Sequence, residues 1–186
     1  MKTQPNKRQL TTNLLIDTAL KLFSEQGYDT TSIRAIAQRA GISLGLMYNY
    51  FKSKEELLAE ICKRGGADVL ASFQEAKSEG QPVSEIERNI RLTVKTLKEK
   101  KDFWKLVYGI RMQSVVVQQF YKEMKKQTAK METQIKQSLI EAGIPFPDLE
   151  AKLYFASLDG IAQHYLLNPN YPIDDVATLL ILKYKK

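Results

Sequence analysis

Cysteine and histidine are almost absent from this chain, which has one residue of each type among 186. The single cysteine, Cys62, rules out an intrachain disulfide framework and a four-cysteine zinc site, so a reducing compartment is expected. The single histidine, His164, forms neither a histidine metal cluster nor a convincing catalytic triad. We therefore expect no metal site and no catalytic histidine in this protein.

The sequence also lacks long apolar runs and the common catalytic motifs. No segment approaches the roughly 20 apolar residues of a membrane span, and the N-terminus has no apolar run typical of a secretory signal. Paired metal ligands, a phosphate-binding glycine loop and a nucleophile motif are absent too. These absences predict a soluble, cytoplasmic protein with no membrane contact, no cofactor and no enzymatic activity.

Basic residues are in excess, and they are unevenly spread along the chain. The formal net charge is +7. Residues 1–64 contain 10 Lys and Arg against 6 Asp and Glu, whereas residues 65–186 contain 18 against 15. The denser positive charge in the N-terminal third is consistent with nucleic-acid binding there, and it also suits an ordinary soluble surface.

The N-terminal part is predicted to be a series of short helices without strands. Apolar periodicity predicts three of them, over residues 11–26, 30–40 and 43–51. Thr30 or Thr31 is expected to cap the second helix through its hydroxyl. Ser53 and Glu56 match a capping box, which opens a fourth helix.

The second and third of these helices are bent sharply against each other through Gly41. This glycine lies where a helix C-terminus needs a residue in the left-handed conformation. Ser43 then stands at a natural N-cap position. Leu44, Met47 and Phe51 share one face of the third helix, at spacings of three and four. Because the other faces are rich in Tyr and Asn, this short helix predicts an external partner.

Several separate sequence elements coincide around this bend. They are Phe23 and Gly27 at the end of the first helix, Thr31, Ile36 and Ala37 in the second, Ala40-Gly41-Ile42-Ser43 in the turn, and then Gly45, Tyr48, Tyr50, Phe51, Lys54 and Leu57. Together they resemble the DNA-binding domain of the TetR family of transcriptional regulators, over residues 19–58. The resemblance implies an all-α protein in which a homeodomain-like helix-turn-helix domain precedes a larger helical ligand-binding and dimerisation domain.

The resemblance also implies roles for individual residues, because the third helix of the family lies in the DNA major groove. Phosphate contacts are expected from hydroxyl, amide and ammonium groups of Thr31, Ser43, Tyr48, Tyr50 and Lys54. Base reading is expected from Leu44, Gly45, Leu46, Tyr48 and Asn49. The operator is expected to be double-stranded DNA with two-fold symmetry.

Two of these positions depart from the commoner family pattern. Leu44 and Leu46 stand where relatives often carry polar or basic residues, and apolar side chains contact only thymine methyls or sugar carbons. Our hypothesis is that Asn49 is the main polar base reader and that the leucines favour thymine. The alternative is that both leucines simply pack on the second helix.

The larger C-terminal part is also predicted to be helical. The fourth helix, opened by Ser53, is expected to loosen at Gly65-Gly66, and a capping box at Ser84 and Glu87 opens another. The charge run 98–102 is expected to be a solvated connection, and Asp148 to cap a later helix. The last two helices, 149–167 and 174–184, are strongly apolar, which suits a homodimer built from a four-helix bundle. The alternative is a purely intrachain core.

A ligand pocket is implied by the resemblance, since regulators of this family release DNA when a small molecule binds. Its candidate lining residues are Trp104, Tyr108, Met112, Phe120, Tyr121, Tyr154, Phe155 and His164, and Arg111, Gln113 and Gln163 are possible polar contacts. Each of these side chains also suits plain core packing. The sequence does not identify the inducer, the operator or the target genes.

The expected organisation is therefore a flexible basic arm (1–9), a helix-turn-helix domain (10–64) and a ligand-binding and dimerisation domain (65–186). The expected function is that of a ligand-responsive repressor, a homodimer that a small-molecule inducer releases from its operator. Two alternatives stay open: a constitutive or architectural DNA-binding protein without a ligand, and a helical enzyme with a DNA-targeting head.

Overall fold

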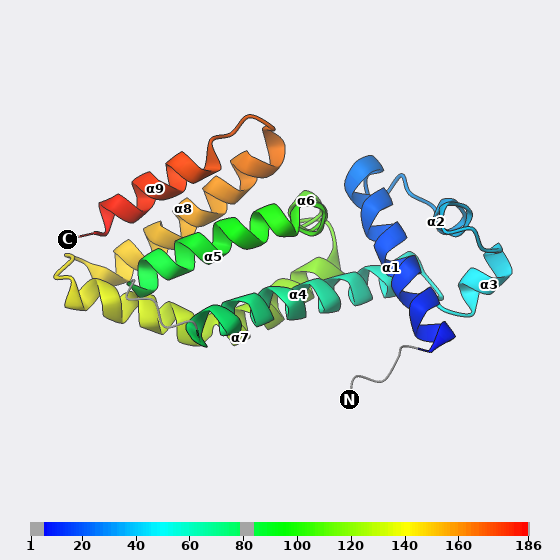
Figure 1. Cartoon of the computed structure of the whole chain (residues 1–186), viewed down its shortest axis with the longest axis horizontal. Helices are drawn as coiled ribbons and strands as arrows, with labels where there is room; N and C mark the ends of the chain where they lie inside the picture. The colour runs from blue at the N-terminus through cyan, green and yellow to red at the C-terminus, as the bar shows by residue number, and fades with distance from the viewer. Residues whose placement is uncertain (1–5, 79–83, 186) are drawn as a thin grey trace. The chain divides into compact units, whose positions relative to one another are not determined.

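The computed structural model describes residues 6–78 and 84–185, and over those residues it contains helices and no strand (Figure 1). The helices are α1 (Lys7–Gln26), α2 (Ile33–Arg39), α3 (Leu44–Tyr48), α4 (Lys54–Ser78), α5 (Glu85–Glu99), α6 (Lys101–Gly109), α7 (Val115–Glu141), α8 (Pro147–Leu167) and α9 (Ile173–Lys183). The all-α prediction is confirmed over the described part of the chain.

The chain divides into two compact units. The first contains Met1–Gly66 and Asp102–Tyr121, and the second contains Ala67–Lys101 and Lys122–Lys186. Helices α4 and α7 contribute to both. The first unit therefore contains the predicted helix-turn-helix domain, 10–64. It also contains nearly all of α6 and the start of α7, which the sequence prediction placed in the other domain.

Helix α1 begins earlier than the sequence predicts. The Asn6 side chain caps it by accepting a hydrogen bond of 2.9 Å from the backbone N–H of Gln9. Residues 7–9, expected in a flexible arm, therefore form the first turn of the helix, and residues 1–5 of that arm lie outside the described residues. The predicted inner stripe is confirmed, because Leu15, Ile16, Ala19, Leu22 and Phe23 are all buried.

Helices α2 and α3 are shorter than predicted. Ser32 caps α2, and neither Thr30 nor Thr31 does, because the Ser32 hydroxyl accepts a 3.1 Å hydrogen bond from Ala35 N–H. Thr31 is only 1% exposed, and its hydroxyl donates to the carbonyl of Gly27 at 2.7 Å. Gly41 adopts a φ of 70° in the turn, as the predicted bend requires.

Helix α4 runs through Gly65 and Gly66 without the loosening that the sequence predicts. Both glycines are buried. At Gly65 a Cβ atom would overlap the ring of Phe103, a residue of α6. The glycine is therefore needed for close packing between the two helices, and this packing holds the local helical conformation against the low helix propensity of glycine.

The charge run 98–102, predicted to be a solvated connection, is exposed at residues 98 and 99 but almost entirely helical. Helix α5 ends at Glu99 and α6 begins at Lys101, so the only break is at Lys100. In the second unit Lys98 pairs with Asp174 at 2.6 Å and Lys100 with Asp68 at 2.5 Å. In the first unit Asp102 pairs with Lys21 at 3.2 Å. These charges therefore connect helices.

The second unit contains the helices α5, α8 and α9, which contact one another and lie side by side in Figure 1. Ser84 caps α5 as predicted, and the core between the three helices includes the fully buried Tyr154. Helix α8 begins at Pro147, after Phe146 in a left-handed conformation with a φ of 52°. Asp148 therefore does not cap it as predicted, and its carboxylate pairs with Lys136 at 2.5 Å.

Candidate nucleic-acid interface

The bend between α2 and α3 is fixed by a serine cap and by buried apolar side chains. The Ser43 hydroxyl accepts a 3.2 Å hydrogen bond from Leu46 N–H, which confirms the predicted cap. Met47 is fully buried and Phe51 is 3% exposed. Because a five-residue helix is not stable by itself, these two contacts with the interior are what hold α3 in place.

The opposite face of α3 is open to solvent. Leu46 is 41% exposed and Tyr48 is 43% exposed, and Gly45 and Asn49 are exposed as well. Leu44 is half-buried, so the alternative in which it packs inward fits it better than it fits Leu46. The residues predicted to read bases thus lie on one short helix and, in the case of Asn49, at its C-cap, and four of the five are exposed.

The predicted phosphate contacts differ in how their polar groups are used. Ser43 is exposed, Tyr50 is half-buried, and the Arg8 guanidinium lies 5.9 Å from the centre of the Tyr50 ring. The hydroxyl of Thr31 is buried and already donates to a carbonyl. Ser32, the next residue in the chain, is exposed.

Lys54 has a structural role that sequence reasoning did not foresee. Its ammonium donates hydrogen bonds to the carbonyls of Tyr28 at 2.8 Å and Asp29 at 3.3 Å, and it lies 4.5 Å from the centre of the Tyr28 ring. The loop between α1 and α2 is thereby tied to the start of α4. The residue predicted to contact phosphate therefore also positions the loop that leads into α2.

Three further residues join this region without having been predicted. They are Arg8, Ser32 and Lys52; the Lys52 ammonium donates to the carbonyl of Tyr48 at 3.0 Å. Arg8 was missed because residues 1–9 were expected to be an arm. Ser32 was missed because three adjacent hydroxyl residues, 30–32, offer equivalent caps in the sequence.

The predicted ligand residues are divided between the two units. Trp104, Tyr108, Phe120 and Tyr121 belong to an aromatic cluster of the first unit, in which neighbouring ring centres lie 5.2–6.1 Å apart. The Arg111 guanidinium lies 4.5 Å from the centre of the Tyr121 ring. Among the described residues, the buried Trp104 indole N–H finds no hydrogen-bond partner.

Of the remaining candidates, Tyr154, Phe155 and His164 belong to the second unit. Tyr154 is fully buried in the second unit and its ring packs edge-on against Phe155 at 5.1 Å. His164 is exposed and stacks on Tyr171 at 5.6 Å. Met112, in the first unit, is 84% exposed.

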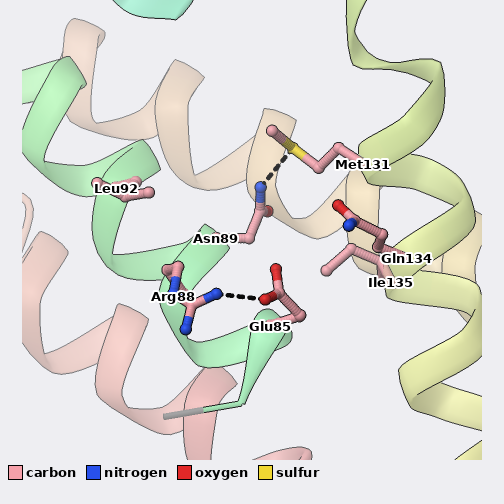
Figure 2. A pocket seen from close by; sticks show the side chains of 7 residues that line it. All are labelled: Glu85, Arg88, Asn89, Leu92, Met131, Gln134 and Ile135. Carbon is pink, nitrogen blue, oxygen red and sulfur yellow. Dashed lines mark hydrogen bonds and ion pairs between the residues drawn. The ribbon is translucent and has the colours of Figure 1, made fainter. Parts of the chain in front are cut away.

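A small cavity in the second unit is shown in Figure 2, where Asn89 points toward Met131 and Arg88 toward Glu85. Its lining residues are Glu85, Arg88, Asn89, Leu92, Met131, Gln134 and Ile135. Its volume is about 20 Å³, enough for about one water molecule. No predicted ligand residue lines it.

A larger, open cavity of about 250 Å³ lies in the first unit, and we name it the Glu55 cavity. Its lining residues are Tyr28, Asp29, Glu55, Ile110, Gln113, Ser114, Val115 and Val116. These come from the α1–α2 loop, the start of α4 and the segment that joins α6 to α7. Of the residues predicted as ligand contacts, Gln113 is the one that lines this cavity.

Reactive groups and metal ligands are sparse in the described part of the chain. Burial raises the pKa of the Cys62 thiol to about 12, which keeps it protonated and unreactive at neutral pH. Among the described residues, no group of three or more His, Cys, Asp or Glu is placed to hold a metal ion. No helix in the described ranges is long and apolar enough to cross a membrane.

Comparison with known proteins identifies the region around α2 and α3. The family described as "Bacterial regulatory proteins, tetR family" matches residues 15–61. The HTH-type transcriptional regulator AcrR of Shigella flexneri is 38% identical over 78 residues, which are 41% of this chain and 36% of AcrR. The HTH-type transcriptional repressor KstR2 of Mycobacterium tuberculosis is 29% identical over 146 residues, 76% of this chain and 72% of KstR2.

The likeness in fold extends over nearly the whole chain. A TetR-like transcriptional regulator from Rhodococcus sp. RHA1 superposes with a TM-score of 0.77 at 21% identity, covering 97% of this chain and 96% of that one. At this level of identity the likeness is one of fold. The chain spans about a third of the length of curated relatives such as AcrR.

Proposed function

Because the chain belongs to the TetR family of bacterial regulatory proteins, we propose that it is a DNA-binding transcriptional repressor that acts as a homodimer on a two-fold operator. The observation that carries the proposal is the arrangement of α3. Met47 anchors this short helix to the interior, and Leu46, Tyr48 and Asn49 stay exposed on it. An exposed helix of this kind fits the DNA major groove.

The contacts that we propose divide into two sets. Phosphate contacts come from Ser43, Tyr48, Tyr50 and Lys54. A further phosphate contact near the start of α2 comes from the hydroxyl of Ser32, because the side chain of Thr31 is buried. Base contacts come from Leu44, Gly45, Leu46 and Asn49 on α3, with Tyr48 contributing to both sets. Phosphate contacts hold register, and base contacts supply the sequence preference.

The proposed dimer forms through α8 and α9. Leu149 and Leu153 on α8, and Leu179 and Leu182 on α9, are each more than half exposed. Glu150 contacts Lys183 and Tyr184, so the start of α8 lies beside the end of α9 and these leucines gather at that end of the pair. Exposed aliphatic surface of this kind is typical of a protein interface.

We further propose that a small-molecule inducer releases the DNA by shifting the protein toward a conformation that no longer fits successive major grooves. The alternative is a constitutive DNA-binding protein without a ligand. To separate the two, DNA affinity is measured with and without candidate lipophilic or cationic compounds. An inducible regulator loses operator affinity with one of them, whereas a constitutive binder keeps its affinity throughout.

Selection of genomic DNA fragments by the purified full-length protein tests the central proposal. We expect enrichment of a two-fold site, and an affinity for it that falls steeply with salt because phosphate contacts release counterions. Recovery of fragments without a shared sequence would favour the architectural alternative. An absence of salt-dependent DNA binding would contradict the proposal altogether. The genes beside the enriched sites then indicate the class of inducer.

A further inference from the structure

The Glu55 cavity has a lining that the proposed DNA contacts do not use. Two of its residues, Asp29 and Glu55, carry carboxylates, and among the described residues that line it none is Lys or Arg. Gln113 and Ser114 add a side-chain carbonyl and a hydroxyl, both of which can accept hydrogen bonds. A negatively charged lining with several acceptors favours a cationic hydrogen-bond donor.

Glu55 is held in its ionised form. Its own backbone N–H and the Ser53 hydroxyl hold the pKa of the Glu55 carboxyl below its usual range. The Tyr28 hydroxyl also donates to this carboxylate, at 3.2 Å. A carboxylate has about four lone-pair positions, so these partners leave it able to accept a further donor.

Lys54, the neighbour of Glu55 in the chain, has its ammonium engaged by backbone oxygens. The Lys54 ammonium donates to the carbonyls of Tyr28 and Asp29, and the Tyr28 ring lies 4.5 Å below it. It partly offsets the two carboxylates without lining the cavity itself. About one negative charge therefore remains for a ligand to balance, which favours a monocation.

The other side of the cavity is aliphatic. Ile110, Val115 and Val116 line it, and Val115 is 75% exposed in this structure. Covering exposed aliphatic surface with a hydrocarbon is favourable, at about 25 cal/mol per Å². The volume of about 250 Å³ lies below the roughly 300 Å³ at which cavities for drug-sized ligands begin, so the occupant is small.

We propose that the Glu55 cavity binds a small organic monocation, an ammonium group carried on a short hydrocarbon chain. The ammonium donates to the carboxylates of Glu55 and Asp29, and the hydrocarbon packs on Val115 and Val116. The site is separate from the aromatic residues predicted to hold an inducer. Its lining joins the α1–α2 loop and the start of α4, which flank the α2–α3 segment, to the α6–α7 segment. If the proposed DNA-binding function holds, occupancy and DNA affinity are therefore coupled, each changing the other by the same factor.

The first test compares three probes of equal chain length on the full-length protein: hexylammonium, hexan-1-ol and hexanoate. Binding is followed through the backbone amide NMR signals of Tyr28, Glu55 and residues 113–116. We expect saturable shifts with hexylammonium, weaker shifts with the neutral alcohol and none with the anion. Equal binding of hexanoate, or shifts spread over the whole protein, would overturn the proposal.

The second test uses matched carboxylate variants. Glu55→Gln keeps an acceptor for Tyr28 and should weaken hexylammonium binding about fivefold, the value of one partly exposed ion pair. Glu60→Gln, on the same helix and paired with Lys63, should leave it unchanged. If Glu55→Gln does not fold by circular dichroism, Asp29→Asn on the exposed loop replaces it with the same expectation. Unchanged affinity in a folded variant contradicts the site.

These outcomes are independent of the proposed function. A protein that binds hexylammonium at Glu55 but fails to select DNA fragments would refute the regulator and retain the site. A protein that binds its operator while ignoring hexylammonium would do the reverse. Where both hold, adding hexylammonium should change operator affinity in the wild type and change it less in Glu55→Gln.

Discussion

The exposed face of α3 and the exposed faces of α8 and α9 differ in chemistry. Helix α3 and its C-cap expose a leucine, a tyrosine and an asparagine within four positions, whereas the large apolar residues that α8 and α9 expose are all leucines. A mixed polar and aromatic face suits a partner with hydrogen-bonding edges and charged phosphates. A patch of exposed leucines suits another protein surface. What a helix leaves uncovered thus indicates the kind of partner, more than its length or its burial does.

The contrast between a DNA-binding face on α3 and a protein-binding face on α8 and α9 fails if the leucines of α9 do not hold a dimer. Leu179→Glu combined with Leu182→Glu should weaken dimerisation by about 4–6 kcal/mol, because an isologous interface loses four buried leucines. Operator affinity should fall at least about a hundredfold, since the two heads then bind separately. Analytical ultracentrifugation and DNA titration measure the two effects.

Ile140→Glu is the matched control for this double variant. Ile140 is a 47% exposed aliphatic residue of α7 in the same unit, and it lies outside the proposed interface. It should leave the dimer intact. If both proteins stay dimeric, the aliphatic face of α9 has another purpose and the dimer forms elsewhere.

The polar side of the comparison is tested at Asn49. Asn49→Ala should cost about 1–3 kcal/mol on the selected operator and little on random DNA, because only a base contact distinguishes the two sequences. Tyr50→Phe, which removes a proposed phosphate contact, should weaken both DNAs alike. DNA titrations at constant salt measure these changes. Equal losses for Asn49→Ala on both DNAs would show that Asn49 does not read a base.

The sequence predicts the inner faces of these helices better than their ends. The α1 stripe and the caps at Ser43 and Ser84 follow from periodicity and from single polar residues at helix starts. The choice between Thr31 and Ser32 depends on which hydroxyl points at a free amide, and three adjacent hydroxyl residues leave that choice to the three-dimensional turn. Asn6 was overlooked as a cap because the residues after it are polar, so no apolar stripe marks the start of α1.

Packing between distant segments is the part that the sequence does not disclose. Gly65 looks like a helix breaker until Phe103, far along the chain, is seen to fill the space beside it. Trp104 and Tyr154 are both aromatic and were both predicted to line a ligand pocket, but they belong to different units. The Glu55 cavity brings together three segments whose residues have no common motif, so only the fold reveals it.

The inner face of α8 sharpens the comparison, because the same helix that exposes leucines buries Tyr154. Its hydroxyl donates to Asn89 Oδ1 at 2.6 Å, and burial raises the pKa of Tyr154 so that it stays a donor. Tyr154→Phe should lower the free energy of unfolding by about 1–1.5 kcal/mol, since it leaves a buried acceptor unpaired. Urea denaturation measures this loss.

Tyr171→Phe is the control for Tyr154→Phe, because Tyr171 is half-buried and stacks on His164 through its ring. The free energy of unfolding of Tyr171→Phe should stay within about 0.5 kcal/mol of the wild-type value. We also expect Tyr154→Phe to keep its operator affinity at temperatures where it is folded. A loss of dimerisation without a loss of stability would mean that the two faces of α8 are not independent.

The smallest expected effect concerns the ion pair that joins α8 to α9. Hydrogen bonds from Lys183 and then Tyr184 lower the pKa of the Glu150 carboxyl. A lowered native pKa adds stability above the unfolded value of about 4.3, and this stability is lost as the pH falls through the native pKa. Because Lys183 stays 48% exposed, the contribution at neutral pH should be less than about 1 kcal/mol.

Glu150→Gln should therefore unfold at a slightly lower temperature than the wild type at pH 7, and the difference should shrink as the pH is lowered toward 3. Thermal denaturation across this pH series measures it. Glu123→Gln removes an exposed pair with Lys126 inside a single helix, and it should show no comparable pH dependence. A constant difference across the series would mean that Glu150 acts through packing alone, and the exposed leucines at this end of α8 and α9 would then be positioned without help from charge.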